Sequence, residues 1–257
     1  MARPANRPTP ELDRRRAARQ IPDDAHGAPA LRPTVLLFDI DGTLLHAGGA
    51  GRRAITRVFA KRHGEGALFD DVRFHGMTDR AIVRGGLARA GLPCDEAAID
   101  ALCAAYLDAL AEEVPRSAGF RVHPGVTVLL DALAGRDAVA VGLGTGNLRE
   151  GARIKLEHAR LHHHFPFGGF GCDHEDRATL VGVGARRGAA HLGVPLEECR
   201  VVVIGDTPHD VAAARAIGAA AVTVETGGCT AEDLSAAGAT RVFPTLAAPG
   251  VCAALLG

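Results

Sequence analysis

Aromatic residues are scarce in this chain of 257 residues, which has no tryptophan, one tyrosine and nine phenylalanines. Proteins bind exposed bases by stacking them on aromatic side chains, so this kind of nucleic-acid binding is not expected. The formal net charge of −1 gives no general attraction to a polyanion or to an anionic membrane surface. No apolar run is long enough to cross a bilayer, and the N-terminus lacks the apolar region of a secretory signal. We therefore expect a cytoplasmic protein without a nucleic-acid or membrane partner, whose oligomeric state the sequence does not indicate.

The six cysteines include no C-x-x-C pair, which excludes a zinc knuckle and a thioredoxin-like motif. A chain of this length does not need disulfides, and without a signal peptide reduced thiols are the better interpretation. Hydrophobic residues make up 47% and charged residues 23%, as is typical of a globular protein.

Four continuous apolar runs predict buried parallel strands. They are residues 34–39, 138–143, 200–204 and 220–224. A shorter strand is expected at 165–170, and helical patterns occur at 149–159, 179–192 and 210–217. Strands that alternate with helices predict an α/β fold with a doubly wound parallel sheet. Functional side chains should then gather at the carboxyl ends of its strands.

Two segments fall outside this alternation. Residues 1–32 are rich in proline, arginine and alanine and predict a flexible tail, with at most one helical turn at 11–19. Residues 50–121 contain helical patterns and no convincing strand. We interpret this second segment as an inserted helical cap domain, which leaves 33–49 and 122–257 as the core domain.

The first functional stretch, Asp39-Ile-Asp-Gly-Thr43, directly follows the first strand. Gly42 allows the chain to turn, so that both carboxylates can face one site. Asp39 could attack phosphorus in line, while Asp41 could protonate a leaving oxygen and later deprotonate water. Two carboxylates repel a phosphate, so a divalent cation is expected beside them. The plain alternative is a strand-to-loop turn with an incidental second aspartate.

The second stretch, Gly144-Thr-Gly-Asn147, follows the second long strand. Thr145 and the neighbouring backbone N–H groups could bind a phosphoryl oxygen, although a simple helix N-cap would explain the same threonine. The glycine-rich residues 142–146 also leave open a nucleotide- or S-adenosylmethionine-binding transferase, a function of a different class.

The third stretch, Gly205-Asp-Thr-Pro-His-Asp210, ends another buried strand. Pro208 is well placed at a helix start, which puts Asp210 in the first turn and close to Asp206. Two carboxylates at this position suit Mg²⁺, which takes few carboxylates together with water and substrate oxygens. A turn followed by a capping aspartate explains either residue alone but poorly explains both.

In this order, the three stretches resemble the first, second and fourth motifs of the haloacid dehalogenase superfamily. The resemblance implies a Mg²⁺-dependent phosphatase that acts on a small phosphorylated metabolite and forms an aspartyl phosphate on Asp39. It further implies three groups of site residues: Asp39, Asp41, Asp206 and Asp210 at the metal, Thr145 at the phosphoryl group, and Gly42, Thr43, Gly146 and Asn147 around the substrate.

The superfamily's third motif supplies a lysine, often as Lys-Pro, but no Lys-Pro occurs between Thr145 and Asp206. Arg177 lies roughly where that lysine is expected, after the strand predicted at 165–170. Lys155 is the other candidate. It lies roughly 12 Å along the helix that follows Asn147, at the limit of its reach, and surface solvation is its plain interpretation. We favour Arg177, and the choice stays open.

Residues 74–80 resemble the substrate-specificity segment of phosphoglycolate-phosphatase-like members. Gly76 would permit a turn toward the core, and Thr78, Asp79 and Arg80 are candidates to contact the leaving group. The alternative interpretation is that Thr-Asp is an ordinary helix N-cap, which explains the same residues. His209 could meet the substrate or occupy a variable motif position, and the three histidines at 162–164 predict a solvated helix end.

Within the superfamily, a phosphomutase uses the same residues and remains an alternative. Asp41 argues against dehalogenation, because displacing a halide from carbon requires no acid for a leaving oxygen. A phosphonatase needs a cap lysine that forms a Schiff base, and Lys61, the only lysine in 50–121, has an exposed setting. A phosphoaccepting signalling module would not explain a helical insertion directly after the nucleophile.

Overall fold

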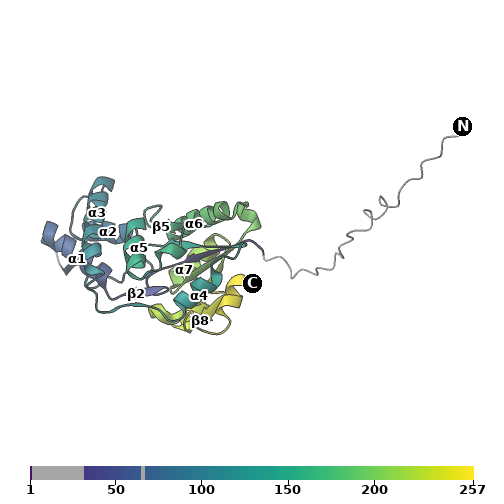
Figure 1. The fold of residues 1–257 in the computed structure, drawn as a ribbon. Helices are drawn as coiled ribbons and strands as arrows, with labels where there is room; N and C mark the ends of the chain where they lie inside the picture. The colour runs from purple at the N-terminus through teal and green to yellow at the C-terminus, as the bar shows by residue number, and fades with distance from the viewer. Residues whose placement is uncertain (2–31, 65–66) are drawn as a thin grey trace. The chain divides into compact units, whose positions relative to one another are not determined.

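The computed structural model in Figure 1 describes residues 1, 32–64 and 67–257. The predicted tail and its helical turn lie outside the described residues. The main sheet has six parallel strands in the order β5-β4-β1-β6-β7-β8. Their bounds are β1 Thr34–Phe38, β4 Val139–Thr145, β5 Gly168–Phe170, β6 Arg200–Gly205, β7 Ala220–Val224 and β8 Arg241–Phe243. The predicted α/β fold with a doubly wound parallel sheet is confirmed.

Helices cover both faces of this sheet, which explains why its strands are continuously apolar. On one face, Leu36 and Phe38 pack in a buried cluster with α4 Val126–Leu133, α5 Arg149–His158 and α9 Val251–Leu256. On the other face, Val35 and Leu37 pack with α6 Arg177–Leu192 and α7 Pro208–Ala216. Helix α8, Ala231–Ala236, follows β7.

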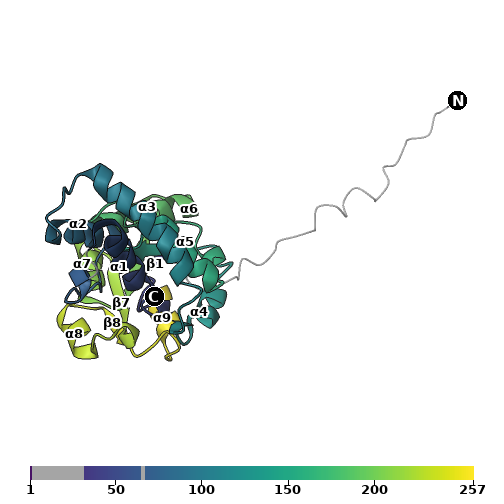
Figure 2. The same cartoon turned by 90° about the vertical axis from the view of Figure 1, so that its left-hand side faces the viewer.

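We call residues 50–121 the cap segment; its described residues contain the α-helices α1 Ala50–His63, α2 Asp79–Arg89 and α3 Glu96–Glu113 and a short 3-10 helix at Ala67–Phe69. They gather at the end of the sheet away from the start of β1 (Figure 1) and come to the front in Figure 2. Apolar side chains of α3, among them Ile99, Leu102 and Leu110, belong to the same buried cluster as Leu36 and Phe38. The cap segment and this face of the sheet therefore share one apolar core.

A second, two-stranded sheet joins the cap segment to the rest of the chain. Strand β2, Leu45–Ala47, precedes the segment, and β3, Phe120–Val122, pairs with it antiparallel. The two connections consequently run side by side, and β3 begins just inside a segment in which no strand was predicted.

No helix within 32–64 and 67–257 combines the length and the apolarity needed to cross a membrane. All six cysteines lie in these described ranges, and none forms a disulfide.

Candidate active site

The functional stretches meet at the topological switch point of the sheet, where the strand order reverses. Strand β1 lies between β4 and β6, and the helices that follow these two neighbours, α5 and α7, pack on opposite faces. Asp39, Thr145 and Asp206 stand at the carboxyl ends of the three adjacent strands. This is the point of an α/β sheet at which ligands bind, because the diverging connections leave a crevice there.

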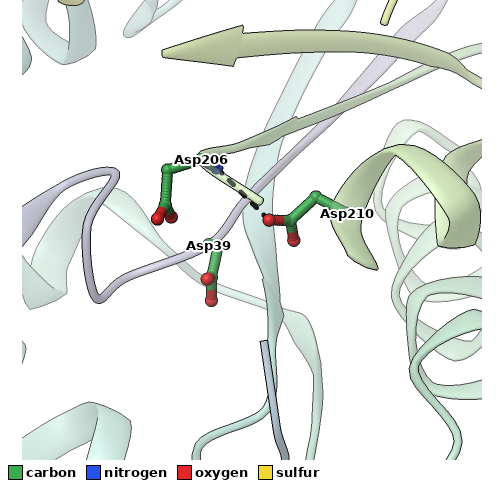
Figure 3. Close-up of side chains that lie close together, drawn as sticks. All are labelled: Asp39, Asp206 and Asp210. Atoms are coloured by element: carbon green, nitrogen blue, oxygen red, sulfur yellow. Dashed lines mark hydrogen bonds between the residues drawn. The ribbon is translucent and has the colours of Figure 1, made fainter. Parts of the chain in front are cut away.

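Three carboxylates form the centre of the site, and we call Asp39, Asp206 and Asp210 the acidic cluster (Figure 3). One oxygen from each lies within 4.8 Å of the others, and all three residues are buried. The hydroxyl of Thr43 donates to Asp206 Oδ1 at 2.9 Å. Asp210 Oδ2 accepts from the backbone N–H of Asp206 at 3.2 Å and from that of Thr207 at 3.0 Å. Hydrogen bonds from the loop after β1 and from the turn after β6 thus fix the carboxylates of Asp206 and Asp210.

The electrostatics of the acidic cluster favour a cation. Burial raises the pKa of Asp39 to about 6, Arg177 opposes this, and the charges of Asp210 and Asp41 add to it. Burial and the negative charges of Asp210 and Asp39 raise the pKa of Asp206 well above its usual value. A divalent cation would offset both causes, the burial of these carboxylates and the repulsion between them. The all-oxygen donor set therefore fits Mg²⁺.

Arg177 binds the acidic cluster from the first residue of α6. Its Nε and one terminal nitrogen donate to Asp210 Oδ1 at 2.9 and 2.6 Å, and the same terminal nitrogen lies 2.9 Å from Asp39 Oδ2. Burial alone would lower the pKa of Arg177, but the charges of Asp210 and Asp39 outweigh burial and raise it. The guanidinium is therefore a permanent positive charge beside the expected nucleophile.

Lys155 also reaches the site, but at a different carboxylate. Its Nζ lies 2.5 Å from Asp41 Oδ2 and 2.7 Å from Asn147 Oδ1, and the residue is only 3% exposed. Surface solvation is thus the wrong interpretation of Lys155. Asp41 lies beyond the end of β1, on the turn at Gly42, and so approaches the side of α5, whose side chains lean toward the helix N-terminus.

The two aspartates of the first stretch consequently differ in pKa. Burial alone would raise the pKa of Asp41, but the charge of Lys155 and the hydrogen bonds from Lys155 and Asn147 lower it. The Asn147 amide donates to Asp41 Oδ2 at 2.9 Å. The pKa of Asp39 is raised and that of Asp41 is lowered, and such a separation of pKa values is expected of two carboxylates with different tasks.

The glycines of the site permit close packing. Gly42 has φ +88°, and a β-carbon there would lie 2.3 Å from Asp206 Oδ2. A β-carbon on Gly142 would lie 2.3 Å from the Phe167 ring, and one on Gly146 would lie 2.4 Å from the carbonyl oxygen of Met77. Residues 142–146 therefore pack against protein atoms, which explains their glycines without a nucleotide.

Thr145 is fully buried, and its Oγ1 accepts from the Asn147 side chain at 2.8 Å. The N-cap of α5 is Leu148, so the N-cap interpretation of Thr145 is wrong. The three histidines predicted at a helix end form a short 3-10 turn after α5, and two of them, His162 and His163, are exposed.

The specificity-like segment of the cap contacts the core. Thr78 is the N-cap of α2 and accepts from the Ala81 N–H at 3.3 Å, which confirms the N-cap interpretation. Arg80 pairs with Glu96 and Asp100. A β-carbon on Gly76, which has φ +75°, would lie 2.3 Å from the ring of His209, whose side chain is exposed. Contact of residues 76–80 or His209 with a leaving group stays a prediction.

Sequence reasoning missed Tyr106, which lies in α3. Its hydroxyl donates to Asp79 Oδ1 at 3.4 Å, and the residue is buried. The only signal in the sequence is that the chain's single tyrosine stands in an otherwise apolar helical pattern.

Comparison with known proteins identifies the class of hydrolases that the fold, the order of the functional stretches and the acidic cluster indicate. Residues 33–218 match the haloacid dehalogenase-like hydrolase family, and the chain belongs to this family. The predicted hydrolase class is confirmed.

Two relatives bear the name phosphoglycolate phosphatase. The chain is 30% identical over 226 residues to that of Rhodospirillum rubrum, with 85% of this chain and 90% of the relative covered. It is 31% identical over 229 residues to that of Caulobacter vibrioides, with 88% and 93% covered. These matches give no support to the transferase alternative, and they favour a phosphatase over a phosphomutase.

Solved structures share the fold. A hydrolase from Pseudomonas syringae has a TM-score of 0.62 at 23% identity and covers 83% of this chain and 94% of its own. CbbY from Rhodobacter sphaeroides has a TM-score of 0.60 at 18% identity, with 84% and 96% covered.

Proposed function

We propose that the protein is a Mg²⁺-dependent phosphatase that cleaves a small phosphate monoester through an aspartyl phosphate on Asp39. The observation that carries this proposal is the contrast between two carboxylates on one turn. Asp39 lies in the acidic cluster beside Arg177, whereas Asp41, whose side chain is 41% exposed, is held by Lys155 and Asn147. One position suits a nucleophile and the other a proton carrier.

Asp39, the backbone carbonyl of Asp41 and Asp206 would hold the Mg²⁺, with Asp210 in support. When bound, the ion supplies positive charge against the charge that develops on the phosphoryl oxygens. The Thr145 hydroxyl and the backbone N–H groups of Gly146 and Asn147 would bind those oxygens.

The reaction would then run in two halves. Asp39 Oδ attacks phosphorus while the bond to the leaving oxygen breaks, and Asp41 gives that oxygen its proton. In the second half Asp41 takes a proton from a water molecule, whose oxygen attacks phosphorus and releases Asp39 together with inorganic phosphate. Arg177 would hold the Asp39 carboxylate in line throughout, in the role for which the family motif supplies a lysine.

The lowered pKa of Asp41 suits the second half, in which it acts as a base. The first half needs its protonated form. An arriving phosphate dianion would raise the pKa of Asp41 by charge repulsion, and so would favour the acid when substrate is bound.

The names of the two relatives make phosphoglycolate the first substrate to test, and a cytoplasmic phosphorylated metabolite fits the expected location. The assay is release of inorganic phosphate from phosphoglycolate, a hexose phosphate, a nucleoside monophosphate and para-nitrophenyl phosphate, with Mg²⁺ and with EDTA. We expect release that requires the metal and a preference for one small ester.

Asp39→Asn is the control that separates this enzyme from a contaminating phosphatase, because it removes the nucleophile and keeps the side-chain shape. Phosphate release that persists in this variant, or that is unaffected by EDTA, would refute the proposal.

A further inference from the structure

Helix α5 begins without a capping side chain of its own. Its N-cap is Leu148, which offers no polar atom to the free N–H groups of the first turn. The carboxylate of Asp79, which belongs to the cap segment, lies at this helix end, and its Oδ2 accepts from the N–H of Leu148 itself at 2.8 Å. A β-carbon on Gly151 would lie 3.6 Å from the same oxygen. A negative charge over the first turn of a helix is stabilising.

Asp79 holds the same loop a second time through its backbone. Its N–H donates to the carbonyl oxygen of Gly146 at 2.9 Å. The approach is so close that a β-carbon on Gly146 would lie 2.4 Å from the carbonyl oxygen of Met77. Tyr106 holds the other carboxylate oxygen of Asp79 from α3. The cap segment is thus hydrogen-bonded to residues 146 and 148, on either side of Asn147.

Asn147 and α5 carry the groups that hold Asp41. The Asn147 amide donates to Asp41, its Oδ1 accepts from Lys155, and Lys155 stands on α5. Neither group comes from the cap segment, yet one cap residue, Asp79, makes two hydrogen bonds to the backbone that positions both.

We propose that Asp79 is a positioning residue whose docking onto residues 146–148 aligns Asn147 and Lys155 on Asp41. The inference rests on the proposed function for its kinetic consequence alone. It assigns Asp79 a structural task at the core loop, which differs from contact with a leaving group.

The test compares Asp79→Ala with Asp79→Asn and with a matched control, Asp95→Ala. Asparagine keeps an acceptor for the Leu148 N–H, whereas alanine removes it. Asp95 is an exposed N-cap of α3 that accepts from Ala98 at 2.8 Å within the cap segment, so its loss tests capping alone. The readouts are amide hydrogen exchange of residues 146–152 in the full-length, metal-free protein, and kcat and KM for para-nitrophenyl phosphate with Mg²⁺.

For Asp79→Ala we expect exchange at 146–152 to rise about 10-fold and kcat to fall about 10-fold or more, with a smaller change in KM. Asp79→Asn should restore most of both values. Asp95→Ala should leave both unchanged. A normal exchange rate in Asp79→Ala, or an asparagine variant as impaired as alanine, would overturn the inference.

Gly146→Ala provides a second test that leaves Asp79 intact, and it decides the matter if Asp79→Ala does not fold. Its β-carbon should push the Met77 carbonyl away and produce the same rise in exchange and the same fall in kcat. Unchanged exchange in Gly146→Ala would contradict the proposal. Because exchange needs no substrate, a wild-type protein inactive on every phosphate ester would refute the proposed function and leave this test standing.

Discussion

Replacing Asp39 by asparagine should abolish turnover and, at the same time, stabilise the metal-free protein. Asparagine has the same shape but cannot act as the nucleophile, so phosphate release should fall about 10³-fold or more. The gain in stability follows from the environment of Asp39, which is buried among other carboxylates. Activity and stability should therefore move in opposite directions at this position.

The size of the gain follows from the pKa of Asp39, which is about 6 in the folded protein against an ordinary value of 3.8. A difference of about 2 pKa units corresponds to about 3 kcal/mol of unfolding free energy. Because the folded state binds this proton more tightly than the unfolded chain, stability is retained below about pH 4 and is lost as the pH rises through about 6. The asparagine variant lacks this loss.

Thermal unfolding in EDTA at pH 4 and pH 7.5 measures the effect. Arg177 loses one partner in the variant but keeps its two contacts to Asp210, so about 3 kcal/mol is an upper limit, or a rise in Tm of up to about 10 °C at pH 7.5. Added Mg²⁺ should stabilise the wild type more than the variant. Asp71→Asn, at an exposed residue paired with Arg89, is the control and should change stability by less than about 0.5 kcal/mol.

The reasoning would be refuted by an asparagine variant that is less stable than the wild type at pH 7.5 in EDTA. A gain of equal size at both pH values would also refute it, because that result would not come from ionisation of Asp39.

Two further substitutions test the rest of the site. Lys155→Met should raise the pKa of Asp41, move the acidic limb of the pH profile of kcat/KM to higher pH and lower kcat/KM by about 10-fold or more. The exposed control Lys61→Met should cause none of these changes. An acidic limb that does not move in Lys155→Met would contradict this role of Lys155. Gly42→Ala should remove turnover and stabilisation by Mg²⁺, because its β-carbon would lie 2.3 Å from Asp206 Oδ2. Gly64→Ala has a similar φ of +74° but nothing within 4 Å, so it should cost about 1–2 kcal/mol of unfolding free energy and keep turnover; equal activity of the two glycine variants would contradict the steric argument.

The sheet could be predicted because strands that are buried on both faces have continuous apolar sequences. The end of each run then located Asp39, Thr145 and Asp206, since parallel strands end at one edge of a sheet. The short elements could not be predicted in the same way. Strands β2, β3 and β8 have three residues each, too few to show a pattern, and the equally short β5 was predicted only as part of the longer stretch 165–170.

The contact of Lys155 with Asp41 could not be predicted from the sequence for a different reason. Its distance from Asp41 depends on how α5 lies against the sheet and on where the turn at Gly42 carries the carboxylate, and neither is encoded locally. The contact of Asp79 with Leu148 joins residues 69 positions apart. Only the folded arrangement of the cap segment brings them together.

The pairing of β2 with β3 has a consequence for how this architecture can be rebuilt. Ala47 lies opposite Phe120, so the chain leaves the sheet and returns to it at neighbouring backbone positions. A two-residue hairpin turn is long enough to join the two ends, because paired strands lie only about 5 Å apart, but removing the excursion without replacing it would expose the apolar core that the cap segment shares with the sheet. An excursion from a relative could be grafted at the same junction without shifting the register of β1, β4 or β6. The acidic cluster draws no carboxylate from the excursion, so such a graft would exchange the cap segment and keep Asp39, Asp206 and Asp210 in place.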